Sequence, residues 1–173
     1  MSGAGAEPAL HFRRPTEADH AQIVERVDDW WGGRQMRALL PRMWFRHFTE
    51  MSWIVEDDRG RLAGFLVGFI SPDHPDIAYA HMIATNPNLR RRGVGRTLYE
   101  RFFADARAAG AREVQAITWP GNRVSVNFHL HLGFRPDDGP GTRPIYGVPA
   151  YRDFDGDDQD RVVLIRTLTD LPG

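Results

Sequence analysis

Arg90-Arg91-Arg92-Gly93-Val94-Gly95-Arg96 is the stretch that decides the fold of this chain. It follows a strand-like run at residues 77–85 and leads into a helix-like run from residue 94 to about residue 109. A glycine-rich turn that opens a helix presents backbone N–H groups without acceptors, at the positive end of the helix dipole. Gly93 and Gly95 lack a Cβ, so the backbone can close around a bulky anion, and the arginines add donors suited to phosphate oxygens. The pattern predicts a pyrophosphate site.

Two other phosphate-binding motifs fit this stretch less well. A Rossmann motif needs Gly-x-Gly-x-x-Gly directly after the first strand and an acidic residue about 20 positions later. Here Leu98 occupies the third glycine position, the stretch lies mid-chain, and Glu113 is one acidic residue among 23. A Walker loop needs a lysine, and this sequence has none. What remains is Arg-x-x-Gly-x-Gly after a strand and a loop containing Pro87, with an arginine-rich surface turn as the plain alternative.

Length and composition favour one globular domain. The chain has 173 residues, of which 42% are hydrophobic, and we expect a disordered tail at residues 1–8 followed by a single domain over residues 9–170. A formal net charge of −1 argues against a nucleic-acid partner. The absence of cysteine excludes disulfides, thiolate metal sites and cysteine nucleophiles. The first residues do not resemble a signal peptide, and the longest apolar run, residues 62–70, is too short for a bilayer. We therefore expect a cytoplasmic protein with no membrane partner and no metal.

Hydrophobic spacing predicts the element order β-α-α-β-β-β-α-β-α-β, which is typical of a mixed sheet with helices on both sides. Thr16 is the expected N-cap of the first helix, with Asp19 near the reciprocal position, and Asn122 is the expected cap of the fourth. A long loop is expected after Phe134. The predicted strands are 9–14, 53–55, 62–70, 77–85, 113–118 and 161–168, and the predicted helices are about 16–31, 36–48, 94–109 and 122–132.

Two motifs, with a helix and a strand between them, resemble a known family. The first runs from Ile83 through Asn86-Pro87-Asn88-Leu89 to Gly95, and the second is Asn122-x-x-Ser125-Val126-Asn127-Phe128-His129-x-x-Leu132-Gly133-Phe134. Over nearly its full length the chain resembles the GCN5-related N-acetyltransferase (GNAT) family. That resemblance implies an α/β fold (an α+β mixed sheet). Its central, mostly antiparallel sheet would have about seven strands, flanked by about four helices, with the fourth and fifth strands splayed apart.

The resemblance also implies acetyl-CoA as the co-substrate, its pantetheine arm lying between the fourth and fifth strands as a pseudo-strand. Backbone groups at Ile83 and Thr85 would then bond the pantetheine amides. The Ile83 N–H would face the thioester carbonyl, where negative charge develops during attack. The cofactor contacts implied in this way are Ile83, Thr85, Arg90, Arg91, Arg92, Gly93, Val94, Gly95, Arg96, Asn122, Ser125 and His129.

Four residues are candidates for the chemistry: His81, His129, Ile83 and Tyr79. Period-two alternation places Tyr79, His81 and Ile83 on one strand face. The arylalkylamine branch of the family has histidines at the positions of Tyr79 and His81, so the resemblance makes His81 the expected base or water relay, with a satisfied core histidine as the alternative. His129 stands where the family usually places a tyrosine that protonates the leaving thiolate. Glu56 is a weaker candidate for the base and is otherwise a solvated charge.

The acceptor pocket in this family is usually built by the first two helices and the hairpin before the last strand. An aromatic lining would favour a small amine with an apolar body, although aromatic residues at helical spacing are also typical of a core. The acidic run at residues 153–160 is either a solvated loop or an attractant for a cationic acceptor. The expected acceptor contacts are Trp30, Trp31, Arg34, Trp44, Tyr146 and Tyr151.

The expected function is transfer of an acetyl group from acetyl-CoA to the amine of a small molecule or peptide, by direct attack and without a covalent enzyme intermediate. Two alternatives stay open: a catalytically silent module that binds or senses acyl-CoA, and an O-acetyltransferase. A homodimer also stays open, and the acceptor cannot be identified from one sequence.

Overall fold

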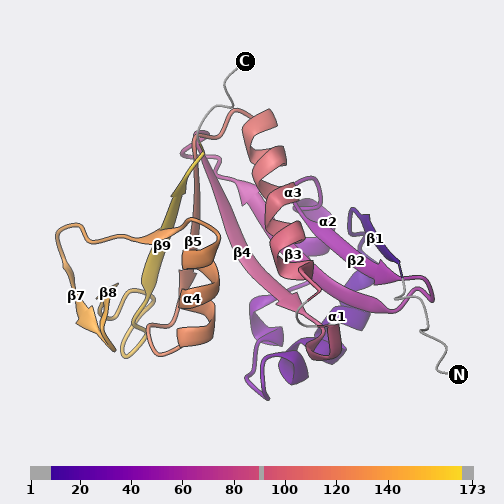
Figure 1. The fold of residues 1–173 in the computed structure, drawn as a ribbon, viewed down its shortest axis with the longest axis horizontal. Helices are drawn as coiled ribbons and strands as arrows, with labels where there is room; N and C mark the ends of the chain where they lie inside the picture. Colours follow the sequence, from indigo (N-terminus) through magenta and orange to yellow (C-terminus); the bar gives the residue numbers. More distant parts are fainter. Residues whose placement is uncertain (1–8, 90–91, 169–173) are drawn as a thin grey trace, which may run out of the picture. The chain divides into compact units, whose positions relative to one another are not determined.

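The computed structural model describes residues 9–89 and 92–168 (Figure 1). The predicted tail at residues 1–8, Arg90 and Arg91, and residues 169–173 lie outside the described residues. Over the described ranges, no helix has both the length and the apolar composition needed to cross a bilayer. The strands are β1 (Leu10–Arg13), β2 (Trp53–Asp57), β3 (Leu62–Ile70), β4 (Ile77–Thr85), β5 (Glu113–Thr118), β6 (Arg135–Pro136), β7 (Thr142–Ile145), β8 (Val148–Tyr151) and β9 (Val162–Thr167). The helices are α1 (Asp19–Trp30), α2 (Trp44–His47), α3 (Val94–Ala108) and α4 (Arg123–His131), with 3₁₀ turns η1 (Arg37–Leu39) and η2 (Pro87–Leu89).

Seven strands form one sheet in the order β1-β2-β3-β4-β5-β9-β6, and β7 and β8 form a separate hairpin. The β4–β5 ladder is parallel, whereas the β1–β2, β2–β3, β5–β9 and β6–β9 ladders are antiparallel. Strands β4 and β5 pair only where Ile77–Tyr79 of β4 lies beside Glu113–Gln115 of β5. In contrast, β5 pairs with β9 along its full length. The mixed, mostly antiparallel sheet with splayed fourth and fifth strands confirms the predicted fold class.

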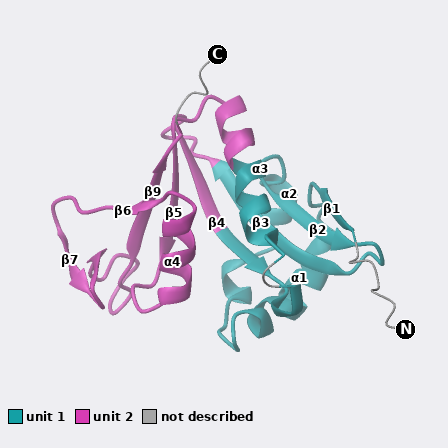
Figure 2. Ribbon diagram, in the orientation of Figure 1, with its two compact units in different colours: residues 1–69, 82–102 teal, residues 70–81, 103–173 magenta. Residues whose placement is uncertain are grey.

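The chain divides into two compact units (Figure 2). Unit 1 comprises residues 1–69 and 82–102, and unit 2 comprises residues 70–81 and 103–173. Strand β4 begins in unit 2 and ends in unit 1, whereas α3 begins in unit 1 and ends in unit 2. The single domain over residues 9–170 stays a prediction.

In unit 1, a close approach between β3 and the start of α3 depends on a glycine. A Cβ at Gly64 would lie 3.0 Å from the carbonyl oxygen of Ala84 and 3.1 Å from Cγ1 of Val94. Any larger side chain would therefore push the first turn of α3 away from the strand. The core of this unit also contains Ile23, Val27, Leu40, Phe45, Ile54, Leu62, Phe65, Val67, Met82 and Ala84.

In unit 2, the sheet has one buried and one half-buried face. Paired residues share a face, so the register of β4, β5 and β9 assigns each side chain to one of them. The buried face carries Ala78, Val114, Ala116, Thr118, Val162 and Leu164. The half-buried face carries Tyr79, Gln115, Ile117, Val163 and Ile165.

Thr16 does not cap α1, so that prediction is wrong. The helix begins at Asp19, and its N-cap, Ala18, makes no side-chain hydrogen bond. Instead, the carboxylate of Asp19 accepts hydrogen bonds from the Thr16 backbone N–H at 2.7 Å and from its hydroxyl at 3.1 Å. Of the expected pair of capping bonds, the one from the Thr16 N–H to the Asp19 side chain forms, but it lies in the turn before the helix begins.

Two longer predictions also need correction. The helix predicted at 36–48 is two short pieces, η1 and α2, because Pro41 lacks an N–H and forces Leu40 out of the helical region, to φ −123° and ψ 59°. The loop predicted after Phe134 contains β6 and the β7–β8 hairpin. Its turn has positive φ at both Tyr146 (50°) and Gly147 (81°), as a type I′ turn requires. Tyrosine is rare at such a position, so the sequence carried no hairpin signal there.

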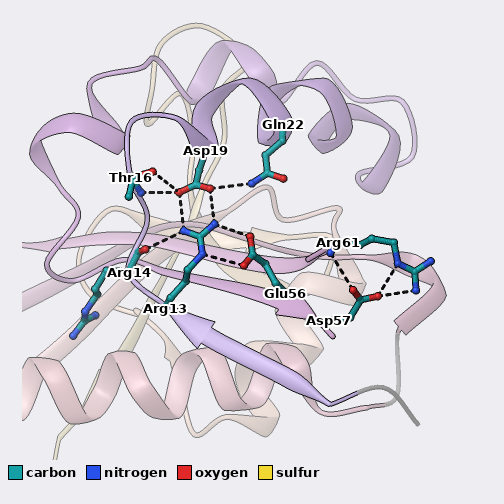
Figure 3. A network of polar contacts seen from close by, with 8 residues as sticks. All are labelled: Arg13, Arg14, Thr16, Asp19, Gln22, Glu56, Asp57 and Arg61. Carbon is teal, nitrogen blue, oxygen red and sulfur yellow. Dashed lines mark hydrogen bonds and ion pairs between the residues drawn. The ribbon is translucent and has the colours of Figure 1, made fainter. Parts of the chain in front are cut away.

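Arg13 links three elements of unit 1 through two carboxylates (Figure 3). Its guanidinium donates to Asp19 at 2.7 and 2.9 Å and to Glu56 at 2.6 and 3.0 Å, joining β1 to α1 and β2. The Asp19 side chain is only 6% exposed. Burial raises the pKa of Asp19, but the hydrogen bonds from Arg13 and Thr16 outweigh it and lower that pKa to about 2. Glu56 is therefore a structural partner of Arg13 and not a solvated charge.

Asp19→Asn is expected to remove an acid-sensitive part of the stability. Because the pKa falls from 3.8 to about 2 on folding, the ionised carboxylate stabilises fully above about pH 4, and this contribution disappears as pH falls towards 2. The shift corresponds to about 2 kcal/mol. In urea unfolding, the variant should start less stable, and its gap to the natural protein should narrow by about that amount between pH 5 and 2. Asp29→Asn, an exposed site on the same helix, is the control, and a constant gap for Asp19→Asn would contradict the linkage.

Candidate active site

One face of β4 carries three of the four predicted catalytic residues. Side chains along the strand alternate strictly between buried and half-buried positions. The half-buried face carries Tyr79, His81, Ile83 and Thr85. The first two belong to unit 2 and the last two to unit 1. The structure therefore confirms that these four residues share one face of one strand.

The loop after β4 is anchored to β3 before it reaches the arginines. The Asn86 N–H donates to the Ala63 carbonyl oxygen at 2.8 Å. The Asn86 side chain accepts from the Asn88 N–H at 3.0 Å, and its carbonyl accepts from the Leu89 N–H at 2.9 Å. These bonds form η2, so the Pro87 loop has a defined shape where it leads into the glycine turn.

Gly93 starts α3 in a conformation that suits glycine. Its φ is +72°, and its carbonyl accepts the first helical bond, from the Thr97 N–H at 2.9 Å. The N–H groups of the first turn then have no acceptor within the helix, and they lie at the positive end of its dipole. Val94 is 3% exposed, and its side chain lies close to Gly64 of β3, within unit 1. The described part of the stretch therefore has the geometry of an anion site. Within that stretch Gly95 and Arg92 are half-buried and Arg96 is exposed.

A small cavity of about 130 Å³ lies beside this loop in unit 1. Sites that enclose drug-sized ligands have about 300–1,000 Å³, so the cavity is too small to hold a coenzyme. It is lined by Asp57, Arg61, Leu62, Asn86, Asn88 and Leu89.

In unit 2, the first turns of α4 bring three predicted cofactor contacts together. Asn122 caps the helix as predicted, because its side chain accepts from the Ser125 N–H at 3.2 Å. The Ser125 carbonyl in turn accepts from Nδ1 of His129 at 2.8 Å. The helix ends in a Schellman turn, where Gly133 has φ +86° and the Phe134 N–H donates to the His129 carbonyl at 3.0 Å. The motif that predicted this helix thus supplies both of its ends.

His129 is neutral near pH 7, and its tautomer is defined by its partner. The side chain is 4% exposed and packs edge-on against Phe134, with ring centroids 5.1 Å apart. Burial lowers the pKa of His129 below 6.5, and the bond to Ser125 offsets only part of this. Because a carbonyl only accepts, Nδ1 carries the proton, and Nε2 of the neutral ring bears a lone pair. In this state Nε2 can accept a hydrogen bond but cannot donate one to a thiolate.

Tyr79 stays protonated over the whole neutral range. Burial and the negative charge of Asp155 raise the pKa of Tyr79 to about 12, while Arg161 acts in the opposite direction. A phenol with this pKa cannot serve as a base near pH 7, but it can donate a hydrogen bond. Of the two polar candidates on this face of β4, His81 is the one suited to accept a proton.

The predicted acceptor residues fall into two groups. In unit 1, Trp30, Trp31 and Trp44 pack against the core, and Arg34 is exposed. In unit 2, Tyr151 donates to Asp137 at 2.6 Å, whereas Tyr146 is 62% exposed.

Sequence reasoning missed three residues in unit 2. Trp119 is 42% exposed and contacts Tyr146, with ring centroids 5.6 Å apart. Arg161 and Asp155 form an ion pair at 2.7 Å. Trp119 stands out in the sequence because it follows β5 and precedes Pro120-Gly121, but no sequence pattern marks the ion pair. Over residues 9–89 and 92–168, no group of three or more His, Asp or Glu side chains is arranged to hold a metal.

Comparison with known proteins identifies the family. The sequence model of the acetyltransferase (GNAT) family matches residues 14–134. The chain belongs to this family, as the two motifs predicted.

The relatives share a modest sequence identity with the chain. An L-2,4-diaminobutyric acid acetyltransferase of Nocardia farcinica is 24% identical over 64% of this chain, and the match spans 57% of that protein. A protein of the same name from Virgibacillus pantothenticus is 27% identical over 71% of this chain and 77% of its own length. The diaminobutyrate acetyltransferase EctA of Paenibacillus lautus, solved with its substrate and coenzyme A, superposes with a TM-score of 0.69. That structure is 18% identical and covers 96% of this chain and 100% of its own, so the likeness shows the fold.

Gly93→Asp should weaken acetyl-CoA binding more than Gly93→Asn. Asp and Asn have the same shape and both tolerate positive φ, and a Cβ at this position meets nothing within 4 Å. Only the aspartate places a negative charge where the diphosphate is expected, so its dissociation constant in calorimetry should be at least about tenfold higher. Equal affinities for the two variants would contradict an anion site at this turn.

His129→Asn tests the lone pair on Nε2. Asparagine can keep a donor to the Ser125 carbonyl but has nothing at the Nε2 position. We expect kcat to fall while the dissociation constant for acetyl-CoA stays within about twofold. A loss of cofactor affinity as large as the loss of rate would show that His129 holds the cofactor site in shape.

For the natural protein, the low pKa of His129 means that activity depending on its neutral form should persist at pH 6.5 and decline only in more acidic solution.

Proposed function

We propose that this protein transfers an acetyl group from acetyl-CoA to the primary amine of a small molecule. The observation that carries the proposal is the turn at Gly93, whose φ of +72° starts α3 after strand β4 and the η2 loop. Membership of the acetyltransferase (GNAT) family supports it. Acyl-CoA is the co-substrate of this proposal, because coenzyme A or acetyl-CoA is present in the similar structures from Paenibacillus lautus and Salmonella typhimurium.

In this proposal the cofactor lies along β4 and ends on the glycine turn. Backbone groups of Ile83 and Thr85 bond the pantetheine arm, and N–H groups from Arg92 to Arg96 hold the diphosphate. Arg90 and Arg91, which lie outside the described residues, stay predicted contacts of the diphosphate. On α4, Asn122, Ser125 and His129 are the proposed contacts from unit 2. Main-chain donors need no particular side chain, so an apolar residue such as Ile83 can serve.

The acceptor amine must lose a proton before it attacks. An amine with a pKa of about 10.4 is mostly protonated at pH 7, a handicap of about 4.6 kcal/mol. A positioned base recovers part of this, typically about 10²–10⁴-fold in rate. We assign this role to His81, directly or through a water molecule. Tyr79 stays protonated and orients the acceptor by donating a hydrogen bond.

The transfer itself forms one bond and breaks one. The neutral amine nitrogen attacks the thioester carbonyl carbon, and the carbonyl oxygen gains the negative charge, which the Ile83 N–H stabilises. The C–S bond then breaks, and the amide product and the CoA thiolate separate. His81 passes the first proton to solvent, so that it can accept the second proton from the nitrogen of the tetrahedral adduct. Since a thiol pKa is near 8.5, the thiolate is a tolerable leaving group without an acid. The thiolate then takes a proton from solvent, and the resulting thiol can donate a hydrogen bond to Nε2 of neutral His129.

The names of the relatives suggest the acceptor. Those from Nocardia farcinica and Virgibacillus pantothenticus are L-2,4-diaminobutyric acid acetyltransferases. We propose a short diamino acid as the acceptor, with Trp30, Trp31, Arg34, Trp44, Tyr146 and Tyr151 as candidate contacts. A cytoplasmic location and a homodimer stay predictions.

The function is tested by thiol release from acetyl-CoA across a panel of amines, followed by mass analysis of the product. An N-acetylated amine supports the proposal. Acetyl-CoA binding in calorimetry with no turnover of any acceptor would indicate a silent binding module, and an acetyl ester would indicate an O-acetyltransferase.

His81→Gln should lower kcat/KM for the amine by about 10²-fold or more, since glutamine can hydrogen-bond but cannot take a proton. The deficit should shrink at high pH, where the free amine is already deprotonated. Tyr79→Phe, on the same face, should cost much less. A pH profile that runs parallel to that of the natural protein would exclude His81 as the base.

A further inference from the structure

Arg161 shares a face with the proposed base. The β5–β9 ladder ends at the pair of Thr118 and Val162, and Arg161 directly precedes Val162 in the chain. It is held in an extended conformation by its bridge to Tyr151. Because Val162 lies on the buried face, alternation places the Arg161 side chain on the half-buried face of unit 2. The register puts Tyr79 on that face, and His81 follows it by period two.

The Arg161 guanidinium is positioned by three contacts. Its Nε donates to Oδ2 of Asp155 at 2.7 Å, Nη1 donates to the Asp160 carbonyl at 2.8 Å, and Nη2 donates to the Gln159 side chain at 3.0 Å. A guanidinium has five N–H groups, so two remain for a ligand beyond these described contacts. The Arg161 side chain is 21% exposed and that of Asp155 is 40% exposed, so both can be reached from solvent.

Asp155 differs from the other acidic residues around it. Asp153 and Asp160 each accept a backbone N–H within the loop, from Asp158 at 2.7 Å and from Asp153 at 2.9 Å. Asp157 is exposed. Asp155 instead turns towards Arg161, and the charges of both residues act on the Tyr79 hydroxyl. The ion pair therefore lies beside the face that carries Tyr79 and His81, and is not part of a solvated charge run.

We propose that Arg161 and Asp155 recognise the head group of an α-amino acid acceptor. The unused N–H groups of Arg161 bind the α-carboxylate, since a guanidinium fork matches carboxylate geometry. The second oxygen of Asp155 accepts from the α-ammonium group. Opposite charges placed side by side fit a zwitterion better than they fit a simple amine or a simple acid. This inference rests on the proposed function and specifies its acceptor class.

Three acceptors separate the two contacts. 2,4-Diaminobutyrate has both head groups, 1,3-diaminopropane lacks the carboxylate, and 4-aminobutyrate lacks the α-amine. Arg161→Gln should lower kcat/KM for diaminobutyrate at least about tenfold, mainly by raising KM. It should change kcat/KM for diaminopropane less than about twofold. Asp155→Asn should lower kcat/KM for diaminobutyrate by a similar factor and lower that for 4-aminobutyrate less, because the amide oxygen can still accept from Nε of Arg161 but no longer carries the charge that attracts the α-ammonium group. Arg161→Lys should restore part of the preference because it keeps the charge.

Asp157→Asn is the matched control, because it removes the same charge from the same loop. It should behave as the natural protein with all three acceptors, which separates a direct contact from the field of an acidic loop. Thermal unfolding of each variant shows that it is folded. Should Arg161→Gln not fold, Arg161→Lys still has to show a weaker preference for the carboxylate.

The failure of this inference differs from that of the proposed function. Equal kcat/KM for the three acceptors in the natural protein, or an equal fall for all three in Arg161→Gln, overturns the head-group contacts and leaves acetyl transfer intact. Binding of acetyl-CoA with no turnover of the three acceptors or of any other amine overturns the proposed function, and the inference with it.

Discussion

Strands β4 and β5 share only three residue pairs, between Ile77–Tyr79 of β4 and Glu113–Gln115 of β5, although each strand continues beyond them for several residues. On its other edge β5 is paired with β9 throughout, so the divergence is confined to the edge facing β4. Backbone N–H and C=O groups need partners wherever they are shielded from water. An extended ligand can supply them as an added strand would. The proposed base, His81, lies two residues beyond Tyr79, the last residue of β4 that pairs with β5, and on the half-buried face of the strand.

Two kinds of charged group emerge from the structure, and they differ in how completely they are paired. The Asp19 carboxylate is buried and accepts from Arg13, Thr16 and Gln22. Such a group holds elements together, because an unpaired buried charge is costly. Asp155 has one ionic partner and is 40% exposed, so it keeps an oxygen for another ligand. Burial also keeps His129 neutral and Tyr79 protonated near pH 7. His129 can therefore accept a proton, and Tyr79 can donate a hydrogen bond.

The proposed contacts between the cofactor and main-chain groups require few particular side chains, and similar folds occur at low sequence identity. Similar structures with TM-scores of 0.64–0.73 are 11–21% identical to this chain. The features that shape the turn at Gly93 and the cap at Asn122 need few residue types: a glycine with positive φ, and an asparagine oxygen at a helix start. The proposed acceptor contacts depend instead on side chains.

The sequence by itself determined the features that are local in the chain. The bounds of β4 and β5, the start of α3 at Val94 and the cap at Asn122 agree with prediction, because alternation, glycine turns and caps act within a few residues. The sequence-based prediction failed where a distant residue supplies the partner. The Asp19 carboxylate accepts from Arg13, which also donates to Glu56, and Thr16 does not cap α1. The β7–β8 hairpin and the Asp155–Arg161 pair were also decided by the tertiary structure. Their residues meet across a loop whose sequence has no periodic signal, and only the strand register places Arg161 on the face of Tyr79.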